Sequence, residues 1–335
     1  MTSRASGPDC VSRRRVLLLA AALGVAACGK GDDVRTDPGN LHDAGGVADV
    51  SGVPVHYLRR GSGSPVILVH GASSNLRDWT MGAFDALAER HDVIAFDRAG
   101  LGRSGWPGPA GARLTEQARL MQAASRQLGV SQAIVVGHSY GGSVALKWAL
   151  EAPATVSGLL LIAAPSQVWP GGLGLSTDLL ANPLTGPALA RAIPALLPRS
   201  VAERAAARVF APQAAPPGYL EHLGVDLVLR PTTLRANALQ LAALKDQIRV
   251  MLAGYPEIAM PVELIHGTAD ETVPLAIHSE PLTLQIPHAR LTRLAGVGHM
   301  PHHVALPEVL AAVARLATVA ERQAGAAPPG SKRLA

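Results

Sequence analysis

The chain has 335 residues, of which 48% are hydrophobic and 16% are charged. This composition permits a large buried core and excludes a chain that is disordered throughout. The formal net charge is +5, but Arg4, Arg13, Arg14 and Arg15 lie in the first 27 residues and no long basic run follows, so we expect no nucleic-acid partner.

The first 27 residues have the pattern of an export signal. Arg13, Arg14 and Arg15 precede the apolar run 16–27, which is shorter than the roughly 20 residues that a membrane-spanning helix needs. Residues 12–17 resemble a twin-arginine export motif. Residues 25–28 resemble a bacterial lipobox, which implies that Cys28 is lipidated and anchors an exported protein in the cell envelope. The alternatives are Sec export and an ordinary signal peptide with a chance cysteine near the cut.

The rest of the chain divides into four parts. Residues 28–50 are rich in Gly and Asp and predict a flexible tether. Residues 51–165 and 241–321 predict the folded core. Between them, residues 166–240 contain short Ala- and Leu-rich segments broken by Pro and Gly, which predict a helical cap. Residues 322–335 predict a disordered tail. Apart from Cys28, the chain has only Cys10, so no disulfide or thiolate metal site is expected in the folded part.

Short apolar runs alternate with segments of helical spacing from residue 53 onward. Apolar runs bounded by Gly, Asp or Pro are typical of buried parallel strands, and their alternation with helices predicts an α/β fold with helices on both faces of the sheet. The predicted strands cover residues 53–59, 65–70, 91–96, 132–136, 157–163, 262–266 and 290–294, and the predicted helices cover 113–128, 143–150 and 307–320.

The segment Gly137-His138-Ser139-Tyr140-Gly141 lies between a predicted strand and a predicted helix. Glycines on both sides of the serine permit a tight turn that raises the hydroxyl above the end of the sheet. In this context, G-x-S-x-G predicts a nucleophile elbow with Ser139 as nucleophile. The alternative is a plain glycine-rich turn.

A serine needs a base to remove its proton and an acid to orient that base. Asp270 and His299 each follow a predicted strand, in the order expected for this arrangement. Glu271 beside Asp270, and His302 and His303 near His299, are the rivals. We expect the last two histidines to be surface or capping residues, and we expect His70, His138 and His266 to be hydrogen-bonding structural residues.

Stabilisation of an oxyanion requires N–H donors. We expect these donors to be the backbone N–H groups of Tyr140, after the nucleophile, and of Ala72, after the strand that ends in His70-Gly71. No P-loop, dinucleotide fingerprint or H-E-x-x-H segment is present, so no cofactor or metal is called for.

Together, His70-Gly71, residues 97–104, residues 137–142, residues 267–274 and Gly298-His299 resemble the α/β-hydrolase superfamily over about residues 53–320. The resemblance implies a mostly parallel eight-stranded sheet with a helical cap, and it places the acid at Asp270. It also implies that residues 97–104 form a structural turn with the potential to border a substrate channel.

We therefore expect a serine hydrolase that cleaves an ester or lactone, with a small apolar substrate under the cap. Carbon–carbon bond hydrolases and cofactor-free haloperoxidases share the resemblance and stay open. Members with an Asp nucleophile are excluded by Ser139, and prolyl aminopeptidases are disfavoured by Tyr140 in place of Trp. Two non-enzymatic alternatives also stay open, a non-catalytic binding protein and a structural lipoprotein. The sequence does not indicate an oligomeric state.

Overall fold

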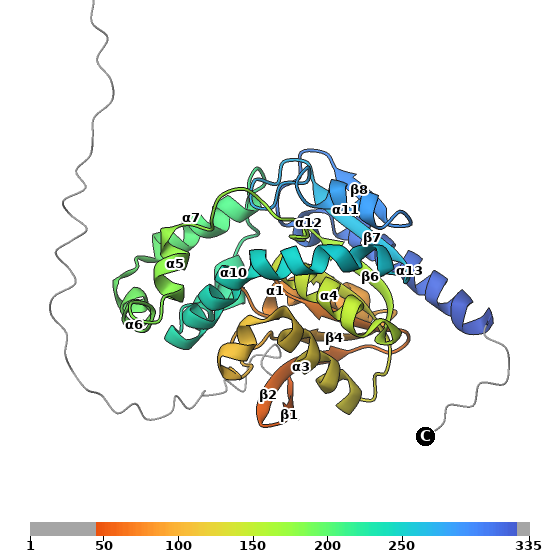
Figure 1. Ribbon diagram of the computed structural model, residues 1–335, viewed down its shortest axis with the longest axis horizontal. Coiled ribbons are helices and arrows are strands. Elements are labelled where there is room, and N and C mark those ends of the chain that lie inside the picture. Colours follow the sequence, from red (N-terminus) through yellow and green to blue (C-terminus); the bar gives the residue numbers. More distant parts are fainter. Residues whose placement is uncertain (1–44, 327–335) are drawn as a thin grey trace, which may run out of the picture. The chain divides into compact units, whose positions relative to one another are not determined.

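The computed structural model describes residues 45–326 and contains an eight-stranded sheet in the order β1-β2-β4-β3-β5-β6-β7-β8 (Figure 1). The pairs β1/β2 and β2/β4 are antiparallel, and all the other pairs are parallel. The predicted mostly parallel sheet is confirmed. The strands are β1 (Gly46–Val50), β2 (Val53–Arg60), β3 (Pro65–Val69), β4 (Asp92–Phe96), β5 (Ala133–His138), β6 (Val156–Ile162), β7 (Val262–Gly267) and β8 (Arg290–Leu294).

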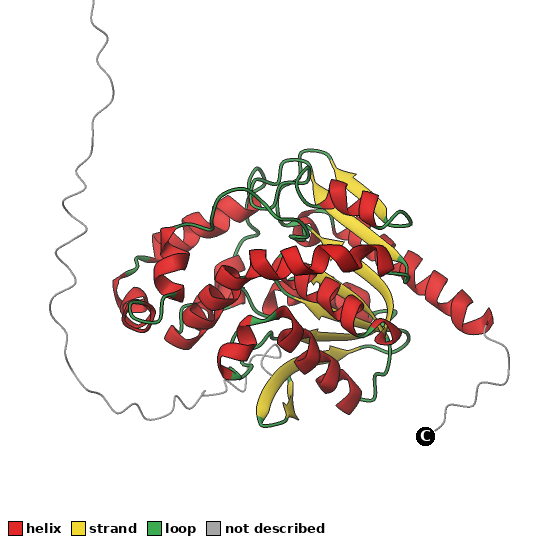
Figure 2. Cartoon of the chain, viewed as in Figure 1, coloured by secondary structure: helices red, strands yellow, loops and turns green. Residues whose placement is uncertain are grey.

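Helices cover both faces of this sheet (Figure 2). In β5, Val135 belongs to the core that the sheet shares with α3 and α4, whereas Ile134 and Val136 belong to the opposite core with α2 and α13. Successive side chains of a strand point to opposite faces, so an apolar strand fills both cores. The helices of these two layers are α1 (Arg77–Thr80), α2 (Ala83–Ala88), α3 (Leu114–Gln127), α4 (Tyr140–Glu151), α11 (Ser279–Gln285), α12 (Pro301–Val304) and α13 (Leu306–Ala326).

The chain leaves the sheet after β6 and returns at β7 through a helical region that we call the cap. Its last helix, α10, packs against α5 and α6 in the cap, while Leu244, Ile248 and Met251 near its end lie in the core beside α4. The cap helices are α5 (Leu175–Ala181), α6 (Gly186–Leu196), α7 (Arg199–Phe210), α8 (Tyr219–Leu223), α9 (Val225–Val228) and α10 (Pro231–Met251).

Three predicted boundaries differ from the structure. The tether predicted to reach residue 50 is wrong over 46–50, because these residues form β1, with Ala48 and Val50 buried. A Cβ at Gly46 would lie 2.3 Å from the Tyr57 hydroxyl, so this glycine permits close packing. The boundary predicted at 240/241 falls inside α10, and α13 continues to Ala326, past the predicted core end at 321.

Within residues 45–326, no helix is both long enough and apolar enough to cross a bilayer. The predicted signal peptide, Cys28 and residues 327–335 lie outside the described residues.

Candidate active site

Ser139 lies at a sharp turn between β5 and α4, with φ 50° and ψ −125°. A non-glycine residue in this region is strained by about 1–3 kcal/mol, which the surrounding packing must overcome. That packing is close: a Cβ at Gly137 would lie 2.4 Å from the Gly141 carbonyl oxygen, and a Cβ at Gly141 would lie 2.2 Å from the Val69 carbonyl oxygen. The two glycines therefore permit the turn that lifts the Ser139 hydroxyl to the sheet edge.

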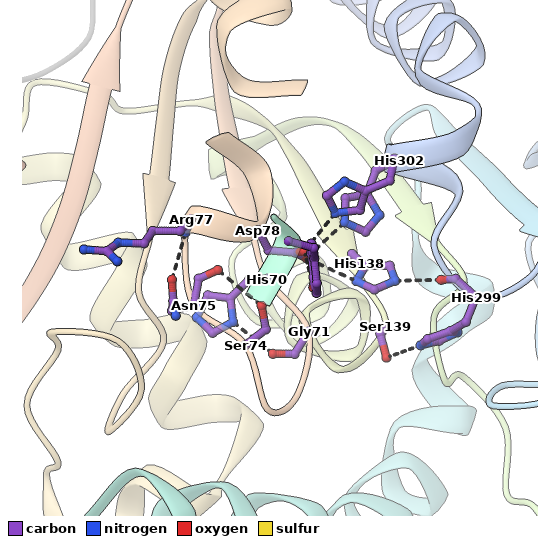
Figure 3. Close-up of polar contacts among 12 residues, drawn as sticks. His70, Gly71, Ser74, Asn75, Arg77, Asp78, His138, Ser139, His299 and His302 are labelled. Carbon is purple, nitrogen blue, oxygen red and sulfur yellow. Dashed lines mark hydrogen bonds and ion pairs between the residues drawn. The ribbon is translucent and has the colours of Figure 1, made fainter. Parts of the chain in front are cut away.

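His299 lies between Ser139 and Asp270. Its Nε2 is 2.9 Å from the Ser139 Oγ, and its Nδ1 is 2.7 Å from the Asp270 Oδ2. Figure 3 shows the Ser139 hydroxyl directed at the ring of His299. Because an Nδ1–H that donates to Asp270 leaves Nε2 without a proton, Nε2 can accept the serine proton.

Asp270 is held as an anion in a buried position. Its Oδ1 accepts the N–H groups of Thr272 and Val273 at 2.8 and 2.9 Å, and the His266 Nε2 is 3.2 Å from its Oδ2. Burial opposes ionisation, but the hydrogen bonds from His266, His299 and Val273 hold the pKa of Asp270 below its ordinary value. The rival acid, Glu271, is exposed.

The loop after β3 approaches the serine from the other side. A Cβ at Gly71 would lie 3.3 Å from the Ser139 Cβ, so glycine permits this contact. Within residues 45–326, neither the Ala72 N–H nor the Tyr140 N–H, the first of α4, donates to a protein acceptor. Both residues line the same cavity as Ser139, and free amides beside a nucleophile are suited to binding an oxyanion.

Arg98 is a buried residue behind this loop that the sequence analysis missed. Its side chain donates to the carbonyl oxygens of His70 and Gly71 at 2.9 and 2.8 Å and to the side chains of Gln117 and Gln240 at 2.8 and 2.7 Å. Its guanidinium carbon lies 4.3 Å from the centre of the Tyr140 ring. Burial lowers the pKa of Arg98 to about 10, so the side chain remains a cation at neutral pH.

The Arg98 guanidinium therefore contacts both residues that supply the free amides. It contacts Ala72 through the Gly71–Ala72 peptide group and Tyr140 through the ring. The carbonyl of Gly71 and the N–H of Ala72 belong to one peptide group. The only hint in the sequence is that Arg98 lies two positions after the end of an apolar strand, β4.

Asp78 is the centre of a second buried cluster, which corrects one prediction. His302 and His303 are not surface or capping residues: their Nε2 atoms donate to the two carboxylate oxygens of Asp78 at 3.0 and 2.9 Å. Tyr219, from the cap, donates to the same carboxylate at 2.9 Å. Burial opposes ionisation, but His302 and His303 hold the pKa of Asp78 well below its ordinary value.

This cluster adjoins the serine through His138 (Figure 3). The His138 Nε2 donates to the His299 carbonyl oxygen at 2.9 Å, and its Nδ1 lies 4.0 Å from the Asp78 carboxylate. As expected, His70 and His266 also form structural hydrogen bonds, to the Gly71 carbonyl oxygen and the Ser279 hydroxyl.

The ligand atoms of Asp78, His302 and His303 lie within 4.8 Å of one another and could hold a metal ion. However, each histidine Nε2 already pairs with a carboxylate oxygen, and Tyr219 adds a third donor. Because these partners satisfy the buried carboxylate without an ion, we interpret the cluster as a hydrogen-bonded brace.

Residues 97–104 form a structural turn, as expected. The Asp97 carboxylate accepts the N–H groups of Leu76 and Arg103 at 2.8 Å and pairs with the His56 Nδ1 at 2.7 Å. None of residues 97–104 lines the cavity beside Ser139, so the expected contribution to a substrate channel is wrong.

A cavity of about 610 Å³ opens beside Ser139, beneath the cap. Ala72, Ser139, Tyr140 and His299 line it, and Asp270 lies behind His299. The structure thus brings together every predicted site residue except Cys28, which lies outside the described residues. The remaining wall is mostly aliphatic, and a predominantly apolar pocket with a few convergent polar groups is typical of a small-molecule site.

Residues 66–313 match the family model described as "Alpha/beta hydrolase family". The chain belongs to this family. An uncharacterized protein of Mycobacterium tuberculosis strain ATCC 25618 / H37Rv is 32% identical to this chain over 273 residues, which cover 74% of this chain and 75% of the relative.

Solved structures share the alpha/beta hydrolase fold. The 2-hydroxy-6-oxo-6-phenylhexa-2,4-dienoate hydrolase from Rhodococcus sp. strain RHA1 is 22% identical with a TM-score of 0.65, over 78% of this chain and 95% of that chain. The enol-lactonase from Burkholderia xenovorans LB400 is 19% identical with a TM-score of 0.65, over 82% of this chain and 100% of that chain. At these identities the likeness shows the fold alone.

Proposed function

We propose that this alpha/beta hydrolase cleaves an ester- or lactone-type bond with Ser139 as nucleophile, His299 as general base and Asp270 as the acid that orients it. The observation that carries the proposal is the pair of contacts made by His299, at 2.9 Å to the Ser139 Oγ and 2.7 Å to Asp270. These distances are within hydrogen-bond reach of a base acting on a serine.

The proposed reaction has two halves. The Ser139 Oγ attacks the substrate carbonyl carbon while His299 takes its proton, and the Ala72 and Tyr140 N–H groups stabilise the tetrahedral oxyanion. His299 then protonates the departing alkoxide, which leaves an acyl-Ser139 ester. Water attacks this ester with His299 again as base, which releases the carboxylic acid and restores the hydroxyl.

The cavity wall favours a neutral, apolar substrate. No Lys or Arg is among the residues that line it. A substrate that carries a carboxylate, such as the dienoate in the name of the Rhodococcus enzyme, would have to bury that charge without a cationic partner, which is costly. The cavity therefore supports ester or lactone cleavage over the carbon–carbon bond alternative, and no observation favours haloperoxidase chemistry.

The test is hydrolysis of p-nitrophenyl esters, from acetate to laurate, by residues 29–335, which contain every described element. We expect Ser139→Ala and Asp270→Asn to lower kcat by about 10⁴-fold, with Glu271→Gln as the matched control that retains activity. A fluorophosphonate probe should label the wild type at Ser139, as read by mass spectrometry. An inactive and unlabelled wild type would instead support a non-catalytic binding protein.

We also propose that the protein is exported and anchored in the cell envelope through a lipid on Cys28. The support is in the sequence: a basic start, a short apolar run and a cysteine at the lipobox position. Metabolic labelling with an alkyne fatty acid should mark the wild-type chain and not Cys28→Ala. Equal labelling of the two would refute the anchor.

A further inference from the structure

Large apolar side chains are exposed in one part of the cap. Within residues 45–326, seven of the twelve exposed large hydrophobic residues lie between positions 168 and 197. Leu175, Leu184 and Leu196 are 71%, 87% and 70% exposed. We call this group the apolar cap face, and its members are Val168, Leu173, Leu175, Leu179, Leu184, Leu196 and Leu197. Such a concentration marks an interaction site, because single exposed apolar residues are usually scattered.

The apolar cap face is formed largely by α5 and α6, which pack on each other and on α10. In Figure 1 these two helices lie at the end of the molecule away from β8 and α13. Val168 and Leu173 belong to the irregular segment before α5, and Leu197 directly follows α6. The exposed leucines therefore gather at one end of the described fold.

This face is continuous with the cavity beside Ser139. Leu173 and Leu197 are exposed to solvent and also line the cavity. An apolar molecule could therefore pass from the face into the cavity while it remains in contact with leucine side chains.

The charges around the face are few and mostly positive. Residues 166–198 contain only Asp178 and Arg191 as charged residues. The next helix, α7, adds three arginines and one glutamate, so residues 166–210 have a formal net charge of +2. Exposed apolar residues flanked by arginines are typical of segments that lie in the interface of a bilayer that contains anionic lipid.

A second copy of the chain is the other occupant that such a face suggests. Protein interfaces depend on aromatic and arginine anchors in desolvated pockets, whereas leucine is under-represented among residues that dominate binding energy. Six of the seven residues of the face are leucines and none is aromatic. Two such faces would also bring together segments that are both positively charged.

We propose that the apolar cap face docks on the surface of a lipid bilayer and that the substrate enters the cavity from that surface. The docking follows from the face itself, while the entry of an ester substrate rests on the proposed function. The substrate would then be an ester or lactone that partitions into lipid.

The test is co-flotation of residues 29–335 with vesicles of phosphatidylcholine and phosphatidylglycerol. This chain lacks Cys28, so binding cannot come from an anchor at that position. We expect the triple variant Leu175→Ser/Leu184→Ser/Leu196→Ser to bind vesicles at least about tenfold more weakly than the wild type. None of the three residues lines the cavity, so hydrolysis of soluble p-nitrophenyl butyrate should be unchanged.

The matched control replaces three apolar residues of similar exposure elsewhere, as Val47→Ser/Val250→Ser/Leu284→Ser, at 60%, 76% and 82% exposed. It should float like the wild type. Docking is refuted if the wild type does not float, or if the cap variant floats as well as the control. A wild type that is dimeric by light scattering, becomes monomeric in the cap variant and does not bind vesicles would assign the face to a second copy.

Failure of the proposed function would give a different result. If no variant hydrolyses p-nitrophenyl butyrate and yet the wild type floats and the cap variant does not, the docking surface stands and the esterase assignment falls.

Discussion

Arg98→Met removes the guanidinium that donates to the His70 and Gly71 carbonyl oxygens and to two glutamine side chains. The glutamines can rotate toward each other, but the two carbonyl groups are fixed by the backbone. An unsatisfied buried acceptor costs about 1–3 kcal/mol. Methionine also removes the desolvation cost of the buried guanidinium, which offsets part of the cost of the unsatisfied acceptors. We therefore expect the free energy of unfolding to fall by about 3 kcal/mol. For a domain of this size, that lowers Tm by roughly 6–12 °C.

Arg98→Lys separates stability from catalysis. An ammonium group keeps the positive charge but lacks the planar fork that reaches both carbonyl oxygens at once. Because the Gly71 carbonyl and the Ala72 N–H share one peptide group, weaker donation to the carbonyl should loosen and depolarise the proposed oxyanion donor. Loss of a whole donor lowers kcat by about 10²–10³-fold, so we expect a decrease of about tenfold with little change in KM.

The assays are thermal unfolding and p-nitrophenyl ester kinetics, both on residues 29–335. Arg119→Met is the matched control, because Arg119 is an exposed arginine of α3 whose partner within residues 45–326 is Glu116 in the same helix. We expect it to unfold and to hydrolyse ester like the wild type. The reasoning about Arg98 is refuted if Arg98→Met unfolds at the wild-type temperature, or if Arg98→Lys changes KM and leaves kcat intact.

Three further predictions concern stability. Gly141→Ala places a Cβ 2.2 Å from the Val69 carbonyl oxygen at the end of β3 and should lower the free energy of unfolding by about 1–3 kcal/mol. Urea unfolding checks this, and Gly172→Ala, whose Cβ would have its nearest neighbour at 4.0 Å, should be neutral. Tyr219→Phe removes a hydrogen bond from the cap to the Asp78 carboxylate and should cost about 1–2 kcal/mol, so an unchanged Tm would show that the cap does not depend on this bond. Burial lowers the pKa of His70, His278 and His302 to about 4. Between about pH 6.5 and 4 the unfolded chain therefore binds more protons than the folded protein, so acidification should lower the free energy of unfolding by up to about 1.4 kcal/mol per pH unit for each histidine. Unfolding free energies that are equal at pH 7 and pH 5 would contradict this.

The sequence was sufficient to predict most strands and to bring the polar groups of the site to one sheet edge. Ser139 directly follows β5, and Asp270 and His299 lie in the loops that follow β7 and β8; the carboxyl ends of parallel strands meet at one edge of a sheet. For these residues, local pattern and topology agree, so the juxtaposition could be inferred before any contact was known.

Residues whose environment depends on distant partners were not predictable in this way. His302 is buried because Asp78, 224 positions earlier, accepts its hydrogen bond, and nothing in the neighbouring sequence indicates this. Arg98 contacts residues that are 19 to 142 positions away. β1 was missed for a different reason: its five residues bury only Ala48 and Val50, so its alternation is too short to be distinguished from a tether.

The two ends of the cap are built differently, and this determines how the cavity can open. At one end α10 continues from the cap into the core as a single helix, Pro231–Met251, so bending there would break helical hydrogen bonds. At the other end residues 167–174 are irregular, with Gly171 and Gly174 at positive φ. The cap is therefore joined rigidly to the core at α10 and through an irregular segment at residues 167–174. Because Tyr219 of α8 donates to the buried Asp78 carboxylate, the cavity can open at α8 only if this hydrogen bond breaks.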